Sequence, residues 1–219
     1  MPRKDLLRPV YAKPLRAFRL WKNYRAEQRR IHAEVLTALG QRQPVKITIG
    51  AGQTRFPGWI ATDIPAFDIR SEQHWRRLFP PASINHILAE HVFEHLTAAQ
   101  FSDFLHSARA YLAVAGRIRI AVPDGNHPSP EYIENVRPGG VGAGAEDHKI
   151  LYTQEIISQL IAGQGYEFAL LEYFDAQGTF HSQPWGAAAG FVSRSAAHDA
   201  RNRDGVLRYT SLIVDCWLP

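Results

Sequence analysis

Val45-Lys-Ile-Thr-Ile-Gly-Ala-Gly52 is a short apolar run that ends in glycine, and Ala61-Thr-Asp63 follows it closely. Further along, Ile87-Leu-Ala-Glu-His-Val-Phe-Glu-His-Leu96 and Gly116-Arg-Ile-Arg-Ile-Ala-Val-Pro-Asp124 repeat this arrangement of an apolar run followed by polar residues. Each run has the length and composition of a buried strand. Because ligands bind at the carboxyl ends of strands in an open α/β sheet, these endings predict one crevice, built from several loops, that holds a nucleotide-like ligand.

Strand-like and helix-like stretches alternate from Val45 onward, which predicts an α/β domain with a mostly parallel sheet. Thr97 opens a helix, because Gln100 completes a capping-box pattern and apolar residues then recur at helical spacing as far as Leu112. The last strand follows no long crossover helix, so we expect it to run antiparallel. The expected strands are 45–49, 59–62, 67–69, 84–89, 117–122, 166–174 and 209–218, and the expected helices are 97–112 and 153–162.

The chain divides into a basic N-terminal helical arm, residues 1–44, and a domain, residues 45–219. Two stretches of the domain, 123–150 and 175–208, are long and rich in loop-forming residues, and we expect them to cap the active site. With 219 residues the chain is long enough to bury a core. A single cysteine, Cys216, and the lack of a signal peptide or a membrane-spanning run predict a cytoplasmic protein.

Charge is distributed unevenly along the chain. Residues 1–46 hold 12 Lys and Arg against 3 Asp and Glu, whereas the remainder holds 13 against 18. In the arm, aromatic residues alternate with arginines, as in segments that bind a membrane surface or a polyanion. The alternative is a helix that packs Phe18, Trp21 and Tyr24 on the domain and leaves its charges in water.

The glycine turn does not match a dinucleotide-binding loop. Arg55 stands where the third glycine of that fingerprint belongs, and Asp63 comes too early for its acidic residue. Residues 53–58 are too few for a pyrophosphate-binding helix. A ligand without phosphates therefore fits better, bound by close backbone approach at Gly50 and Gly52. An ordinary tight turn is the alternative.

The four quoted stretches resemble the class I S-adenosylmethionine-dependent methyltransferases, most closely the small predicted methyltransferases of the type 11-like group. Corresponding stretches in that group run Leu-Gly-x-Gly, Gly-Trp-x-x-x-Asp, His-x-x-Glu-His-Leu and Gly-Gly-x-x-x-Ile-x-x-Pro-Asp. The resemblance implies a Rossmann-like fold with a mostly parallel sheet, an antiparallel last strand and helices on both faces. It departs from the pattern in a short first crossover and at Arg117, where the group often has glycine.

By this resemblance the cofactor is S-adenosylmethionine. Its methionine moiety would lie against the glycine turn, its ribose at the end of the second strand, its adenine beside the residues that follow, and its methyl group beyond the next strand. The resemblance implies Gly50, Ala51 and Gly52 for the methionine moiety and Asp63 and Ile64 for the ribose. It implies Ser71, Glu72 and Trp75 for the adenine, and Glu90 and His91 for the methyl group.

His91-Val-Phe-Glu-His95 also matches the zinc motif of inverted metallopeptidases. That motif requires a helix, so that both histidines share one face. Here the segment leaves a strand directly, and the helix signal begins only at Thr97. We therefore expect no metal site, and Glu94 and His95 are expected to anchor the turn.

Methyl transfer requires alignment of the acceptor, together with a base where the acceptor is a hydroxyl or an amine. We expect the catalytic residues to be His91, Asp124 and, as the favoured base, His148, which adjoins Glu146 and Asp147. The candidates for substrate contact are His127, Asp147, Tyr152, His181 and Arg194. The expected acceptor is a glycan, a lipid-linked molecule or another small molecule, and the basic arm suggests contact with a membrane surface or a polyanion. The alternative is a non-catalytic protein that binds a cofactor or a polyanion.

Overall fold

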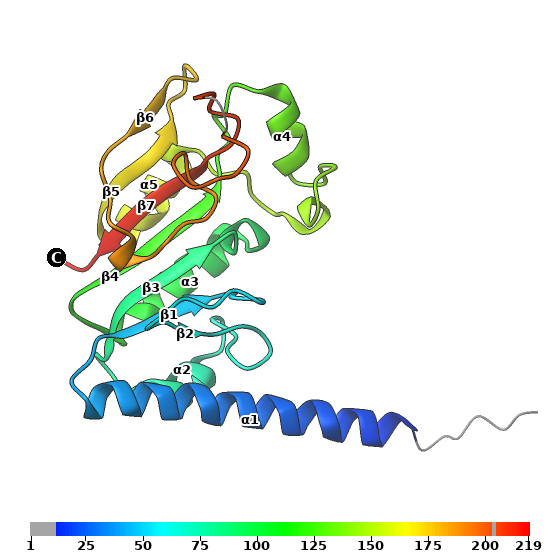
Figure 1. The fold of residues 1–219 in the computed structure, drawn as a ribbon, viewed down its shortest axis with the longest axis vertical. Coiled ribbons are helices and arrows are strands. Elements are labelled where there is room, and N and C mark those ends of the chain that lie inside the picture. The colour runs from blue at the N-terminus through cyan, green and yellow to red at the C-terminus, as the bar shows by residue number, and fades with distance from the viewer. Residues whose placement is uncertain (1–11, 203–204) are drawn as a thin grey trace, which may run out of the picture.

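The computed structural model describes residues 12–202 and 205–219, with side chains from residue 23 onward. A seven-stranded sheet in the order β2-β1-β3-β4-β7-β5-β6 forms its centre (Figure 1). Neighbouring strands from β2 to β4 are parallel, β7 is antiparallel to both of its neighbours, and β6 forms a hairpin with β5. The strands are β1 Val45–Ile49, β2 Ile60–Ala61, β3 Ile84–Glu90, β4 Leu112–Pro123, β5 Glu167–Phe174, β6 Phe180–Ser182 and β7 Ser211–Trp217. The predicted α/β class, the mostly parallel direction and the antiparallel last strand are confirmed.

The helices confirm part of the sequence prediction and correct its boundaries. The capping box at Thr97 is present, but the helix ends at Arg109, because Tyr111 is already part of the approach to β4 and its carbonyl accepts from the main chain of Ser83 and Ile84. Residues 67–69 lie in irregular chain rather than in a strand. The helices are α1 Ala12–Gly40, α2 Glu72–Leu78, α3 Ala98–Arg109, α4 Pro130–Val136 and α5 Gln154–Gly163, with 3₁₀ turns η1 Phe93–His95, η2 Ala145–Asp147 and η3 Ala187–Ala189.

The main core lies on one face of the sheet. Alternate residues of the strands, such as Ile118, Ile120 and Val122 of β4, meet buried side chains of α1, α2, α3 and α5 there. Trp75 of α2 is fully buried in this core, stacks on Tyr111 and donates its indole N–H to a main-chain carbonyl. Figure 1 shows α3 and α5 together on this side of the sheet.

Irregular chain covers the second face, where the resemblance implied helices. In a small apolar cluster on this face, Leu88 and Ile213 of the sheet pack against Val192. All residues of segment 183–195 are described, and the 3₁₀ turn η3 is its only helical element. Arg119 of β4 ties this cover to the sheet. Its guanidinium forms a bidentate pair with Asp215 at 2.7 and 2.8 Å and also donates to the carbonyls of Gly186 and Gly190.

Residues 23–44 of the N-terminal arm pack on the domain. Ile31 and Val35 of α1 belong to the main core, and the side chain of Gln28 donates to the carbonyl of Ala66. Tyr24 hydrogen-bonds His74 of α2. Phe18 and Trp21, which the packing alternative also named, lie outside the residues whose side chains are described. Among the described residues, no helix combines the length and apolarity that crossing a membrane requires.

Replacing Asp215 with Asn should destabilise the fold, because it leaves the buried guanidinium of Arg119 without its carboxylate. We expect a loss of about 3 to 5 kcal/mol in the free energy of unfolding, measured by urea denaturation. The control is Glu72→Gln, which removes the exposed pair with Arg76 and should change nothing measurable. Equal stability of Asp215→Asn and the native protein would contradict this account of the second face.

Candidate functional site

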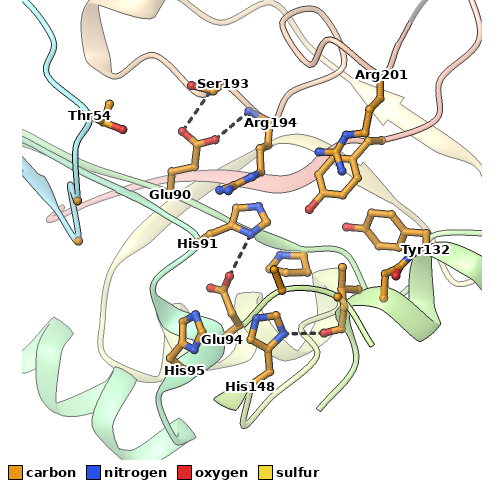
Figure 2. Close-up of a pocket in the computed structure, with 18 of the residues that line it drawn as sticks. Thr54, Glu90, His91, Glu94, His95, Tyr132, His148, Ser193, Arg194 and Arg201 are labelled. Carbon is orange, nitrogen blue, oxygen red and sulfur yellow. Dashed lines mark hydrogen bonds and ion pairs between the residues drawn. The ribbon is translucent and has the colours of Figure 1, made fainter. Parts of the chain in front are cut away.

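A cavity of about 1180 Å³ lies at the carboxyl ends of β1, β3 and β4, the edge of the sheet that the sequence predicted. The two long segments, 123–150 and 175–208, supply the walls that the strand ends do not (Figure 2). Residues that line the cavity include Gly50, Ala51, Gly52, Thr54, Glu90, His91, Glu94, His95, His127, Tyr132, His148, Ser193, Arg194, Arg201, Arg208 and Tyr209.

The glycine turn after β1 forms one wall. Gly50 and Gly52 both have positive φ angles, +62° and +51°, which favour glycine. A Cβ on Gly50 would lie 2.6 Å from Val92, whereas a Cβ on Gly52 would meet no atom within 4 Å, so the space beside Gly52 is open. Asp63 braces the turn, since its Oδ2 accepts from the N–H of Gly52 at 2.9 Å.

Glu90, at the end of β3, is on the cavity wall but fixes the loop opposite. Its two carboxylate oxygens accept from the main-chain N–H groups of Ser193 at 3.1 Å and Arg194 at 2.8 Å. The guanidinium of Arg194 makes no hydrogen bond to any described residue and lies beside His91 in Figure 2. Arg201, on the same loop, pairs with Asp199 and lies over the ring of Tyr209.

His91 follows β3 in the left-handed conformation, with a φ of +56°. Its Nδ1 lies 3.1 Å from Oε1 of Glu94, and its Nε2 is 3.0 Å from the hydroxyl of Ser211. Both ring nitrogens of His91 therefore have a partner. Glu94 is 1% exposed, and neither of its oxygens makes a hydrogen bond within the described chain.

His148 comes from the other long segment and points into the same part of the cavity. Its Nδ1 lies 2.7 Å from the carbonyl of Val136 and must carry a proton to donate to it, so Nε2 is the nitrogen that faces other partners. The ring packs edge-on against His95, whose Nδ1 lies 3.6 Å from Oδ2 of Asp147. Asp147 itself is exposed, and its ion pair with Lys149 lowers the pKa of its carboxyl.

Segment 123–150 is held down by aromatic stacking. The ring of His127 stacks on Tyr132 of α4 at 3.9 Å, and the Tyr132 hydroxyl donates to the carbonyl of Thr210 next to β7. Burial lowers the pKa of His127 to about 4, so the ring is neutral at pH 7. Its Nδ1 accepts from the N–H of Ser129, which places the proton on Nε2.

Asp124 is not a cavity residue. It is fully buried, and its oxygens accept from the main-chain N–H groups of Asn126 at 2.9 Å and Phe174 at 2.7 Å. It therefore joins the end of β4 to the end of β5, and our prediction of a catalytic Asp124 is wrong. Burial raises the pKa of its carboxyl to about 6, against the opposing effect of these two hydrogen bonds.

Several other predicted residues also lie away from the cavity. Tyr152 is fully buried and donates to the carbonyl of Phe93, and Trp75 is enclosed by aromatic rings in the main core, so neither meets a ligand. His181 pairs with Asp175 beside the β5–β6 hairpin. The remaining three are Ile64, which is 68% exposed outside the lining, Ser71, which caps α2, and Glu72, which is exposed on α2.

Sequence reasoning missed part of the lining. Thr54 belongs to the glycine turn, Tyr132 and Ser193 come from the two long segments, and Tyr209 directly follows the second of them. Their positions depend on how those segments fold back, which no local pattern in the chain specifies.

No protein-family model matches the chain, and no protein of established annotation is similar to it in sequence. Similar solved structures include an S-adenosylmethionine-dependent methyltransferase from Archaeoglobus fulgidus, 13% identical, with a TM-score of 0.47 over 91% of this chain and 97% of that one. Another is from Mesorhizobium loti, 10% identical, with a TM-score of 0.48 over 82% and 95%. A third, from Thermotoga maritima, is 11% identical, with a TM-score of 0.45 over 92% and 95%. These similarities are too distant to assign a function.

Asp124→Asn should lower stability by about 1 to 3 kcal/mol, because an amide N–H₂ would then face a main-chain N–H. The stability advantage of the native protein over Asp124→Asn should shrink as the pH rises from about 4 to about 6. The pKa of the Asp124 carboxyl is raised to about 6 in the fold, so the folded state binds this proton more tightly than the unfolded state, and that contribution is lost as the proton leaves. Urea unfolding of both proteins across this range measures the difference. A difference that is constant or grows with pH would contradict the assignment.

Proposed function

We propose that the chain transfers a methyl group from S-adenosylmethionine to a small acceptor held in the cavity. The observation that carries this proposal is the glycine turn of Gly50 and Gly52, braced by Asp63, at a cavity that the ends of β1 and β3 share. No helix follows β1 in residues 50–59, so the turn offers main-chain groups but no helix N-terminus for a phosphate. This favours a cofactor without phosphates, as the sequence resemblance implies.

The residues present fit such a cofactor. Gly52 leaves open space beside the turn, in which the methionine moiety would lie against main chain. Each oxygen of Asp63 accepts one main-chain hydrogen bond, from Gly52 and from Ile64, and keeps a lone pair for a ribose hydroxyl. When bound, the cofactor supplies an electrophilic methyl group on a sulfonium. The chain would align the acceptor with it and exclude water.

We propose an acceptor that carries an anionic group. The guanidinium of Arg194 faces the cavity without a hydrogen bond to any described residue, and Arg201 and Arg208 line the same side. A carboxylate or phosphate on the acceptor would complete the hydrogen bonding of Arg194. An acidic glycan or another acidic small molecule, among the acceptors expected from the sequence, suits this wall.

S-adenosylhomocysteine should raise the melting temperature. At 100 times its Kd, a ligand that binds only the folded state adds about 2.7 kcal/mol, or about 5 to 10 °C for a chain of this size. Asp63→Ala should weaken binding about 10- to 100-fold in calorimetry, because charge-assisted bonds to the ribose are lost. Asp103→Ala, which changes an exposed residue of α3, is the matched control. No stabilisation of the native protein by this ligand or by S-adenosylmethionine would refute the proposal.

Labelled methyl groups should reveal the acceptor class. Incubation of the protein with methyl-labelled S-adenosylmethionine and a fractionated cell extract should label small molecules or glycans that an anion-exchange resin retains. Arg194→Ala should reduce this labelling, whereas Arg70→Ala, which alters an exposed pair with Asp68, should not. Label found in nucleic acid, or equal labelling by both variants, would contradict the proposed acceptor.

A further inference from the structure

Glu94, His95 and His148 form a cluster of ligating side chains at one end of the cavity (Figure 2). One ligand atom from each residue lies within 4.8 Å of those of the other two. Glu94 and His95 come from the 3₁₀ turn after β3, and His148 follows the 3₁₀ turn η2. Two main-chain bonds hold these segments together, because the carbonyl of Glu94 accepts from Lys149 at 2.6 Å and from Ile150 at 3.4 Å.

The buried side chain of Glu94 has a close contact with His91 at one oxygen and no hydrogen-bond partner at the other among the described residues. It is 1% exposed, and neither oxygen makes a hydrogen bond within the described chain. Nδ1 of His91 lies 3.1 Å from Oε1, and Oε2 makes no hydrogen bond within the described chain. Buried carboxylates are usually paired, hydrogen-bonded or bound to a metal, so this one points to a missing cation.

The ring of His148 is oriented as a metal ligand. Histidines that bind a metal through one nitrogen usually donate the other N–H to a carbonyl or a carboxylate. His148 does this through Nδ1, which donates to the carbonyl of Val136 at 2.7 Å, so its Nε2 has a free lone pair. His95 has the carboxylate of Asp147 at 3.6 Å from its Nδ1.

We propose that Glu94, His95 and His148 bind a divalent transition-metal cation of the Zn²⁺ or Co²⁺ type. Two imidazoles and one carboxylate suit these ions, whereas Mg²⁺ and Ca²⁺ prefer oxygen ligands throughout. Three protein ligands beside a cavity leave coordination positions open, as in catalytic zinc sites. This proposal departs from two expectations from the sequence, that the chain has no metal site and that His148 acts as a base. It is also not the peptidase motif, because His91 pairs with Glu94 and Ser211 and is not a ligand.

If the proposed methyl transfer is correct, an open coordination position would hold an oxygen of the acceptor. The cation would lower the pKa of an acceptor hydroxyl held there, so that its proton could pass to solvent. The methyl group would pass to that oxygen as its carbon–sulfur bond breaks, and S-adenosylhomocysteine would remain. This role rests on the proposed function, but the binding of the metal does not.

The test uses the untagged full-length protein, treated with a chelator and dialysed free of metal. Titration with CoCl₂, followed by visible absorption, should saturate at one Co²⁺ per chain. Glu94→Gln and His148→Gln should each weaken binding at least about 100-fold, beyond the effect of losing an orienting partner. His181→Gln is the control, because His181 also pairs with a carboxylate but lies outside the cavity lining. Equal affinities of these three variants, or no saturable binding by the native protein, would overturn the proposal.

A second measurement applies if a variant does not fold. Proton NMR of the native protein loaded with Co²⁺ should show strongly shifted, exchangeable imidazole N–H resonances from the two ligand rings, that of His148 Nδ1 among them. Absence of any such resonance in a saturated sample would overturn the site. S-adenosylhomocysteine binding is measured separately on the metal-free protein. If the protein binds Co²⁺ but not S-adenosylhomocysteine, the metal site is supported and the proposed function is refuted. If it binds S-adenosylhomocysteine but not Co²⁺, the proposed function is supported and the metal site is refuted.

Discussion

Acidic side chains at the ends of three strands hold the two long segments from which the cavity is built. Glu90 of β3 accepts from the N–H groups of residues 193 and 194, and Asp124, just after β4, accepts from those of residues 126 and 174. Glu172 of β5 accepts from Ala196, Trp185 and Thr210. Irregular chain carries N–H groups that no strand or helix satisfies, and unpaired buried groups are costly. The carboxylates meet this need, and the shape of the cavity depends on them.

The same constraint explains how far the sequence could be interpreted. Apolar runs with polar endings located the strands, their common edge and the glycine turn, because strand burial and positive φ angles are local properties. Asp124 was placed at the correct edge but given a catalytic role, because the pattern does not reveal which main-chain N–H groups need an acceptor. The prediction that Trp75 borders the adenine was wrong for a related reason. Only the packed core shows that Tyr111 and neighbouring side chains enclose Trp75. The walls from residues 129–148 and 193–209 arise from long-range folding.

The cavity walls divide into chemically different parts. The glycine turn presents main chain, Arg194, Arg201 and Arg208 line another part, and the floor presents Glu94 with the two histidines. A ligand with a cationic sulfonium, an anionic acceptor and a metal cation would each meet a matching part. This separation favours a site that holds a cofactor, an acceptor and a metal cation. A general polyanion-binding surface would instead have its basic residues spread along an exposed face.

The segment His91-Val-Phe-Glu-His95 acts through a change of backbone direction. The left-handed φ of His91 ends the strand, Phe93 enters the core, and the 3₁₀ turn then directs Glu94 and His95 to the cavity. A continuous helix would have placed both histidines on one face, and the turn instead separates them. The third ligand must then come from elsewhere, and the bonds of Lys149 and Ile150 to the carbonyl of Glu94 bring it from segment 123–150. A cation bound by the cluster would therefore link the two segments a second time and stabilise the contact between them.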